Sequence, residues 1–240
     1  MISIIIPVIN EADTIVSLLQ YISENTSVKN ITELIIVDGG STDNTLEIVG
    51  LFSKNSNLNI RLISSEKGRA KQMNKAAHSA TGRILYFLHA DSIPPNSFDE
   101  SIISVIAKGG AAGCFRMKFD SEHPLLKVSQ WFTRFNVKLF RGGDQSLFIS
   151  KKLFDQMNGY DQQYVIYEDC EFIDRIYERC SFTIIPDYIL TSARKYDEMG
   201  TWKLQYHFAV IHLKYGMGAT AKTLHGYYKK HISKKNSELL

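Results

Sequence analysis

Two aspartates close short apolar runs, where the edge of a parallel β-sheet would bring them close together. Asp38 ends Glu33–Asp38, and Asp91 ends Arg83–Asp91, just before Pro94-Pro95. Apolar runs bounded by Gly and Pro are typical of buried strands. Ligands of open α/β sheets bind outside the carboxyl ends of the strands. Asp91 is therefore a candidate ligand for a divalent metal and a phosphate, with the start of a turn as its structural alternative.

Other acidic residues are expected where helices begin. Glu11 follows the apolar run Met1–Val8 and precedes a helical pattern, and Glu168-Asp169 precedes another. Acids in the first turn of a helix are favoured by the helix dipole, which is the structural explanation for both sites. Glu11 also lies at a strand–helix junction, where ligands bind.

Glycine-rich turns accompany these acids. Gly39-Gly40 permits a sharp turn and a close ligand, although the segment has neither the dinucleotide fingerprint nor a phosphate loop. Lys67-Gly68-Arg69 stands at a predicted helix start, which suits a phosphate or a base edge, with a solvated basic face as the alternative. A second polar turn spans 141–145 and includes Asp144 and Gln145.

The elements that must position these residues follow from the apolar pattern. Strands are predicted at Met1–Val8, Glu33–Asp38, Ile60–Ser64, Ile84–Asp91, Ala111–Phe119 and Phe182–Pro186. Helices are predicted around Ile15–Ile22, Thr45–Phe52, Lys67–Ala80, Phe98–Lys108, Pro124–Phe140, Lys152–Met157, Glu168–Tyr177 and Trp202–Lys214. The alternation favours an α/β fold with a mostly parallel sheet and helices on both faces. The aromatic residues of Pro124–Phe140 are expected in the core, and 192–196 is expected to be a loop.

Composition limits the class of protein. The 240 residues are 44% hydrophobic, as in a globular chain with a sizeable core. The net charge of +3 is too small to indicate nucleic acid binding. Three cysteines without metal-ligand spacing suggest a reducing, cytoplasmic compartment. Neither a basic leader nor an apolar run of about 18 residues is found, so a secreted or membrane-spanning chain is not expected.

Charge is concentrated in the last part of the chain. From Arg194 onward, nine basic residues face three acidic ones, a net charge of +6 that leaves −3 for residues 1–193. The aromatic segment Trp202–Lys214 is followed by Lys222–Lys235, which contains Tyr227, Tyr228 and His231. Basic aromatic sequence of this kind can lie on an anionic membrane surface. A dimer arm and a solvated tail are the alternatives.

Five motifs in one order resemble family 2 glycosyltransferases of the GT-A fold. They are Pro7-Val8-Ile9-Asn10-Glu11, Val37-Asp38-Gly39-Gly40-Ser41-Thr42-Asp43, Gly68-Arg69-Ala70-Lys71-Gln72-Met73-Asn74, Phe87-Leu88-His89-Ala90-Asp91 and Tyr167-Glu168-Asp169. The likeness is to the small bacterial branch with a His-Ala-Asp metal motif and a Gly-Asp-Gln loop. The resemblance implies a GT-A-like catalytic domain over 1–195, with a basic aromatic helical extension over 196–240.

The resemblance also implies a reaction, in which an inverting transferase moves a sugar from a nucleotide-sugar donor to an acceptor hydroxyl. In such enzymes Glu11 would bind the ribose hydroxyls, and Asp38 would accept from the imide N–H of uracil, which favours a UDP-sugar. The full set of residues implied to bind the donor is Pro7, Asn10, Glu11, Asp38, Gly39, Arg69, His89, Ala90, Asp144, Gln145 and Arg194.

Three further roles come from the same resemblance. Asp169 would be the general base that takes the acceptor proton, and Glu168 would orient its loop. Asp91 would hold Mn²⁺ or Mg²⁺ against the diphosphate, since such ions take oxygen ligands. Many relatives carry a second carboxylate in this motif, where the present chain has His89. An imidazole there could ligate the metal, hydrogen-bond the donor or simply pack.

Two other functions remain open. A sugar-phosphate nucleotidyltransferase would share the β/α start and the metal, but it would carry a glycine-rich basic loop after the first strand. The other alternative is a non-catalytic nucleotide-binding scaffold of the same fold, against which the retained Asp38, Asp91 and Asp169 argue. A lipid-linked acceptor at the inner face of the membrane would explain the basic tail, and a homodimer is also open. The sequence identifies neither the sugar nor the acceptor.

Overall fold

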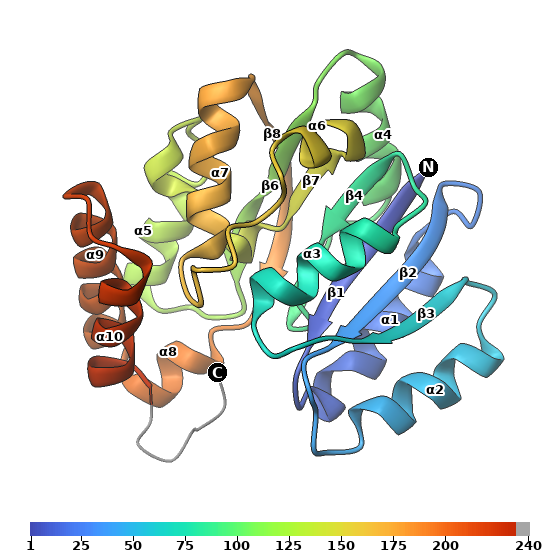
Figure 1. The fold of residues 1–240 in the computed structure, drawn as a ribbon, viewed down its shortest axis with the longest axis horizontal. Coiled ribbons are helices and arrows are strands. Elements are labelled where there is room, and N and C mark those ends of the chain that lie inside the picture. The colour runs from blue at the N-terminus through green and yellow to red at the C-terminus, as the bar shows by residue number, and fades with distance from the viewer. Residues whose placement is uncertain (234–240) are drawn as a thin grey trace.

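The computed structural model describes residues 1–233 and folds them around one eight-stranded sheet flanked by helices (Figure 1). The strands are β1 Ile2–Val8, β2 Ile31–Asp38, β3 Ile60–Ser64, β4 Ile84–Phe87, β5 Ser92–Ile93, β6 Ala112–Phe119, β7 Leu147–Ser150 and β8 Phe182–Thr191. The helices are α1 Ala12–Asn25, α2 Thr45–Asn55, α3 Arg69–Ser79, α4 Phe98–Ala107, α5 Pro124–Phe132, α6 Lys151–Gln156, α7 Glu168–Arg179, α8 Arg194–Met199, α9 Thr201–Gly216 and α10 Ala221–His231, with short 3₁₀ turns η1 Lys138–Phe140 and η2 Gly143–Gln145.

The sheet has a parallel half and a mixed half, in the order β3-β2-β1-β4-β7-β6-β8-β5. β1 is parallel to β2 and β4, and β2 is parallel to β3. β7 is antiparallel to both β4 and β6, whereas β6 and β8 run parallel. This confirms the predicted α/β class, and it places the ends of β1, β2 and β4 at one edge.

Two hydrophobic cores cover the two faces of this sheet. Alternate residues of a strand point to opposite faces, so Ile4 and Ile6 pack in one core with α1, α2 and α4, while Ile5 packs in the other. The second core includes α3, α6 and α7, which lie on the near face in Figure 1. Each of these isoleucines is fully buried, and such burial contributes roughly 1.5–3 kcal/mol per side chain. The apolar run of β1 thus forms the centre of the fold.

The C-terminal helices form a third core with the body. Leu204, Ile211 and Leu224 from α9 and α10 pack with Phe119 of β6 and with Leu126 of α5. The predicted division between residues 195 and 196 falls within α8, and it stays a prediction. In residues 1–233 no helix is long and apolar enough to cross a bilayer. Residues 234 and 235 of the predicted basic tail lie outside the described residues.

Several predicted boundaries were wrong. β4 ends at Phe87 rather than Asp91, so His89 and Asp91 lie in the turn that follows. The predicted loop 192–196 is helical from Arg194. β8 continues to Thr191 because the chain bulges at Pro186 and the pairing with β6 then resumes, as expected for a residue that lacks an N–H donor.

The helix predicted over Pro124–Phe140 stops at Phe132, and its aromatic residues do not enter the core. Thr133 ends the helix, because its hydroxyl accepts from the Met117 N–H at 3.1 Å and ties the chain to β6. The guanidinium of Arg141 then binds the carbonyl oxygens of Thr133 and Phe135, at 2.7 and 2.5 Å. Trp131 and Phe135 are left 46% and 40% exposed.

Candidate active site

The ends of β1 and β2 are joined by hydrogen bonds between their following turns. Asn10, which has a φ of 55°, donates its N–H to Ser41 Oγ at 2.9 Å and accepts from the Thr42 N–H at 2.8 Å. The Glu11 N–H donates to Thr45 Oγ1 at 2.9 Å, and the Glu11 carboxylate accepts from Thr14 at 2.7 Å. Asn10 and Glu11 therefore lie beside the Asp38 turn, and their role in donor binding stays a prediction.

Asp38 is buried and organises its own turn. Its Oδ2 accepts from the Gly40 N–H at 2.9 Å, and its Oδ1 accepts from the N–H and hydroxyl of Ser41 at 3.1 and 2.5 Å. Oδ2 also accepts from the Ser41 N–H at 3.2 Å, so each carboxylate oxygen receives two donors from the turn. The carboxylate thus holds the glycine turn in shape.

Gln72 has a structural role that the sequence reasoning missed. Its Nε2 donates to the carbonyl oxygens of Val8 and Val37, at 3.0 and 2.8 Å, and so ties together the last residues of β1 and β2. A Cβ atom at Gly39 would lie 2.9 Å from the Gln72 carboxamide. Gly39 is therefore required by Gln72 itself, independently of any ligand.

The opposite side of the site is built from three distant segments. His89 is buried in the turn after β4, with its Nδ1 3.8 Å from Asp144 Oδ1 and its Nε2 3.6 Å from Asp169 Oδ2. Burial and the nearby Arg69 disfavour the imidazolium, but the two carboxylates outweigh them and raise the pKa of His89 to about 10. Burial disfavours the Asp144 carboxylate, but the nearby His89 outweighs this effect and lowers the pKa of Asp144. At neutral pH a cationic His89 thus bridges the loop and the start of α7.

Glycine at position 143 is what allows this approach. A Cβ atom there would lie 2.7 Å from Cγ of Asp169 and 2.8 Å from Cε1 of His89. These contacts are far inside van der Waals distance. The loop that carries Asp144 can therefore close against Asp169 only with glycine at this position.

Glu168 and Arg69 connect the two sides of the site, namely the turns after β1 and β2 and the segments around His89. Arg69 Nη1 lies 3.8 Å from Oε1 of the buried Glu168. Burial and the charge of Asp169 raise the pKa of Glu168 to about 7, although Arg69 opposes the rise. Desolvation disfavours the Arg69 cation, but the carboxylates of Glu168, Asp169, Asp144 and Asp91 together raise its pKa. Those four acids therefore converge on one guanidinium at the start of α3.

The donor set around Asp91 fits one kind of metal. Asp91 is part-exposed, and its carboxylate accepts only a long 3.5 Å hydrogen bond from Ser92. Residues 1–233 contain no cluster of three or more His, Cys, Asp or Glu side chains suited to a metal. Mg²⁺ and Mn²⁺ can be held by one carboxylate when phosphates and water supply the other ligands. Asp91 fits that arrangement, whereas His89 is already engaged by two carboxylates.

The remaining residues predicted to bind the nucleotide-sugar donor differ in their exposure. Arg194 is exposed on α8, where its N–H donates to Ser192 Oγ at 3.2 Å. Gln145 is buried and pinned, since its Nε2 donates to the Phe140 carbonyl at 2.5 Å and its Oε1 accepts from Arg141. Ala90 is buried in the core behind the site, and Pro7 lies within β1.

Two tyrosines and a lysine near the acids were also missed. The Tyr160 hydroxyl is buried without a hydrogen-bond partner among the described residues, and burial and then Asp169 raise its pKa well above the ordinary value. Tyr167 precedes Glu168 with a φ of 69°. Burial acts to raise the pKa of Asp144, and the charge of the nearby Lys195 is one of those that lower it. The only sequence signal was their place beside the motifs.

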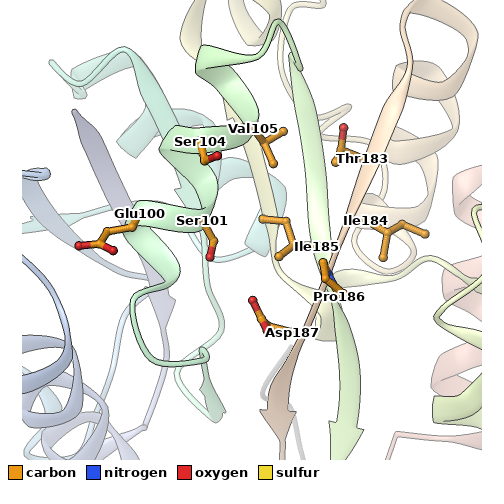
Figure 2. Close-up of a pocket in the computed structure, with 9 residues that line it drawn as sticks. All are labelled: Glu100, Ser101, Ser104, Val105, Thr183, Ile184, Ile185, Pro186 and Asp187. Atoms are coloured by element: carbon orange, nitrogen blue, oxygen red, sulfur yellow. The ribbon is translucent and has the colours of Figure 1, made fainter.

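An open groove of about 500 Å³ lies elsewhere, between α4 and β8. Figure 2 shows side chains from both elements around it, among them Glu100, Ser104 and Asp187. None of the acids that converge on Arg69 lines this groove. The candidate site is therefore defined by its convergent side chains and not by the depth of a pocket.

Comparison of the sequence with known proteins finds glycosyltransferases. Residues 3–166 match the family model described as Glycosyl transferase family 2, a match that ends just before Glu168. The chain is 29% identical over 207 residues to a PGL/p-HBAD biosynthesis glycosyltransferase of Mycobacterium bovis BCG, covering 83% of this chain and 78% of the relative. It is 36% identical over 110 residues to glycosyltransferase AglE of Haloferax volcanii, covering 45% of this chain but only 36% of that relative.

Solved structures share the fold at low sequence identity. The Staphylococcus aureus TarS fragment in complex with UDP superposes with a TM-score of 0.66 at 19% identity, covering 80% of this chain and 60% of that one. The mannosyltransferase PcManGT of Pyrobaculum calidifontis, in complex with GDP-Man and Mn²⁺, gives a TM-score of 0.70 at 19% identity, covering 95% of this chain and 69% of that one. These neighbours are GT-A glycosyltransferases, and the present chain has their architecture.

Proposed function

The chain belongs to glycosyl transferase family 2 and is a glycosyltransferase, and from this premise we propose that it inverts the anomeric centre of a nucleotide-sugar donor. The observation that carries the proposal is the position of Asp169. Its carboxylate stands at the start of α7, beside His89 and the 143–145 loop and close enough to Arg69 to interact with its charge. A carboxylate held in this way suits a general base.

In the proposed reaction Asp169 accepts the proton of an acceptor hydroxyl. The hydroxyl oxygen forms a bond to the anomeric carbon from the face opposite the leaving group. The bond between that carbon and the diphosphate oxygen breaks, and its electron pair leaves with the nucleoside diphosphate. One displacement of this kind inverts the configuration. His89 and the tight fit at Gly143 fix the carboxylate, so positioning supplies much of the rate.

We propose that the leaving nucleoside diphosphate binds at the start of α3. Arg69 offers a half-exposed guanidinium there, which suits a diphosphate, and the first turn of a helix favours anions. Asp91 would hold Mn²⁺ or Mg²⁺ against the diphosphate, and such an ion when bound neutralises charge that builds on the leaving group. The Pyrobaculum neighbour, which shares the fold, is in complex with both GDP-Man and Mn²⁺.

For the base we propose uracil. The resemblance to the family assigns the imide N–H of uracil to the buried Asp38 carboxylate, which accepts from Gly40 and Ser41 in this structure. The TarS structures are complexes with UDP and UDP-GlcNAc, whereas PcManGT is a complex with GDP-Man. These complexes support a nucleoside diphosphate sugar. Uracil N3–H and guanine N1–H can both donate to a carboxylate, so the choice of uracil rests on the resemblance to the family.

The test separates donor binding from chemistry. Thermal unfolding is measured with UDP, GDP, CDP and TDP, each with Mn²⁺, with Mg²⁺ and with chelator. We expect UDP to stabilise the protein most, and more strongly with metal. Asp169→Asn should keep this stabilisation and lose transfer at least 100-fold, as expected when a general base is removed. Loss of UDP binding in the variant would instead make Asp169 a structural residue, and inversion is read from the anomeric configuration of the product.

A further inference from the structure

Helix α9 carries an unpartnered apolar stripe. Its buried side chains Leu204 and Ile211 face the third core, whereas the opposite face carries large side chains at helical spacing. These exposed residues are Trp202 (71%), Tyr206 (64%) and Leu213 (64%), followed by Met217 (78%) directly after the end of the helix. Single exposed apolar residues are common, but a continuous stripe of this size indicates a binding surface.

A second exposed apolar region adjoins it. Residues 128–139, from α5 to η1, expose Trp131 and Leu139, the latter to 61%. The ring of His123, at the start of α5, lies 6.4 Å from the ring of Trp202, at the start of α9. We call residues 128–139 and the exposed stripe of α9 together the docking face. In Figure 1, α5 and α9 lie on the same side of the molecule, and α2 lies at the opposite edge.

The segments that carry the docking face, together with α10, contain only cationic charged residues. Residues 124–140 and 201–231 contain no Asp or Glu. Their cations are Lys127, Arg134, Lys138, Lys203, Lys214, Lys222, Lys229 and Lys230. Lys127 and Lys138 pair with acids outside these segments, namely Glu122 and Asp174. Aromatic and apolar side chains bordered by Lys and Arg suit the headgroup region of an anionic bilayer.

The aromatic residues of α10 do not belong to this face. Tyr228 is buried in the third core, and Tyr227 bonds through its hydroxyl to His207 Nδ1 at 2.8 Å. His231 stacks on His207 with ring centroids 5.2 Å apart. The predicted membrane contact of the basic tail thus moves to α9 and α5, with α10 as their support.

The docking face is joined directly to the candidate site. His212 Nδ1, on α9 beside Leu213, lies 2.6 Å from the Tyr167 hydroxyl, and Tyr167 immediately precedes Glu168 and Asp169. On the other side η1 continues into the loop that carries Gly143. A surface bound at the docking face would therefore lie next to both segments that hold the proposed base.

We propose that the docking face binds an anionic lipid surface and holds the candidate site beside it. A second copy of the chain is the other apolar occupant to consider. Identical patches face each other in a symmetric dimer, so the cations would meet like charges there, which is unfavourable. Anionic headgroups complement these cations and leave the apolar side chains to enter the bilayer. The proposal concerns binding alone and does not depend on the chemistry at Asp169.

The experiment measures co-sedimentation of the full chain with phosphatidylcholine vesicles, with and without phosphatidylglycerol, at low and high salt. We expect binding only to the anionic vesicles, weakened by salt because the charges are screened. Leu213→Glu should reduce binding strongly. Lys203→Glu should reduce it about fivefold for each unit of charge, on the order of twentyfold in total.

Matched controls are available on α2, at the far edge of the molecule. Leu51 is 55% exposed and Lys54 is also exposed, so Leu51→Glu and Lys54→Glu repeat the same changes away from the docking face. Both should bind vesicles as the wild type does. Should Leu213→Glu fail to fold, Lys203→Glu carries the test, and circular dichroism identifies that case.

Three results would overturn the proposal. They are the absence of binding to anionic vesicles, an equal loss of binding in the α2 controls, and a dimer in sedimentation velocity that Leu213→Glu converts to a monomer. The last result would assign the docking face to a second copy of the chain.

Discussion

Replacing Gly143 with alanine should inactivate the enzyme without unfolding it. The added methyl would meet Asp169 Cγ at 2.7 Å and His89 Cε1 at 2.8 Å. Carbon atoms pack best at about 3.5–4.0 Å, so the carboxylate or the loop must retreat by on the order of 1 Å. The backbone of residue 143 has no positive φ, so alanine is conformationally allowed and the effect comes from the contact alone.

A misplacement of about 1 Å at a reacting group costs about 100-fold in rate, or about 2.7 kcal/mol of transition-state stabilisation. We therefore expect kcat of Gly143→Ala to fall about 100-fold. Overpacking typically costs about 1–3 kcal/mol in the free energy of unfolding. The stabilisation by UDP should change little. The turns after β1 and β2, which are proposed to bind the nucleoside, lie on the other side of the site.

The matched control is one residue away. A Cβ atom at Gly142 would have no atom within 4 Å, and its φ of −170° is ordinary extended backbone. Gly142→Ala should therefore keep wild-type kcat. Release of nucleoside diphosphate measures the rate, and urea unfolding measures stability. If Gly143→Ala transfers sugar as fast as Gly142→Ala, Asp169 does not act from the position seen here.

Three further predictions concern stability, pH and the metal. Gln72→Ala removes the Nε2 donor from the carbonyl oxygens of Val8 and Val37, of which Val8 keeps the Gly39 N–H, so it should cost about 1–3 kcal/mol in urea unfolding. Gln20→Ala on the exposed face of α1 should stay within about 0.5 kcal/mol. Folding raises the pKa of Glu168 to about 7 and that of His89 to about 10. Each group therefore contributes stability at low pH that is lost as the pH rises through its folded pKa. The free energy of unfolding should fall from about pH 5 to pH 9, with the part below pH 7 absent in Glu168→Gln, and a flat profile in the wild type would contradict both shifts. Asp91→Asn should bind UDP equally well with Mn²⁺ and with chelator, and a persistent metal effect on the unfolding temperature would remove Asp91 as the ligand.

The elements of the parallel half could be predicted because their signals are local. The continuous apolar run of β1 and the five residues of β3 were visible in the sequence, and the helices between the strands followed from apolar spacing. The exposure of the α5 aromatic residues could not be predicted. Spacing shows that side chains share a face, but Thr133 and Arg141 decide where that helix stops and what covers the face.

The site divides in the same way. The sequence indicated Asp38, Asp91 and Asp169 because each stands beside a strand end or a helix start. It left His89 open between a metal ligand, a donor contact and a packing residue. Only the fold places His89 between Asp144 and Asp169 and thereby makes it a cation that holds two carboxylates.

The α/β class, the order of the central elements and the family of the chain follow from the amino-acid sequence alone, because short motifs and residue spacing carry that information. Packing in three dimensions was needed to show which acids lie near the same arginine, why Gly39 and Gly143 must be glycine, and which aromatic residues remain exposed. These properties depend on atoms that are distant in the chain and close in space, and such distances are set only when the whole sheet and its helices have packed.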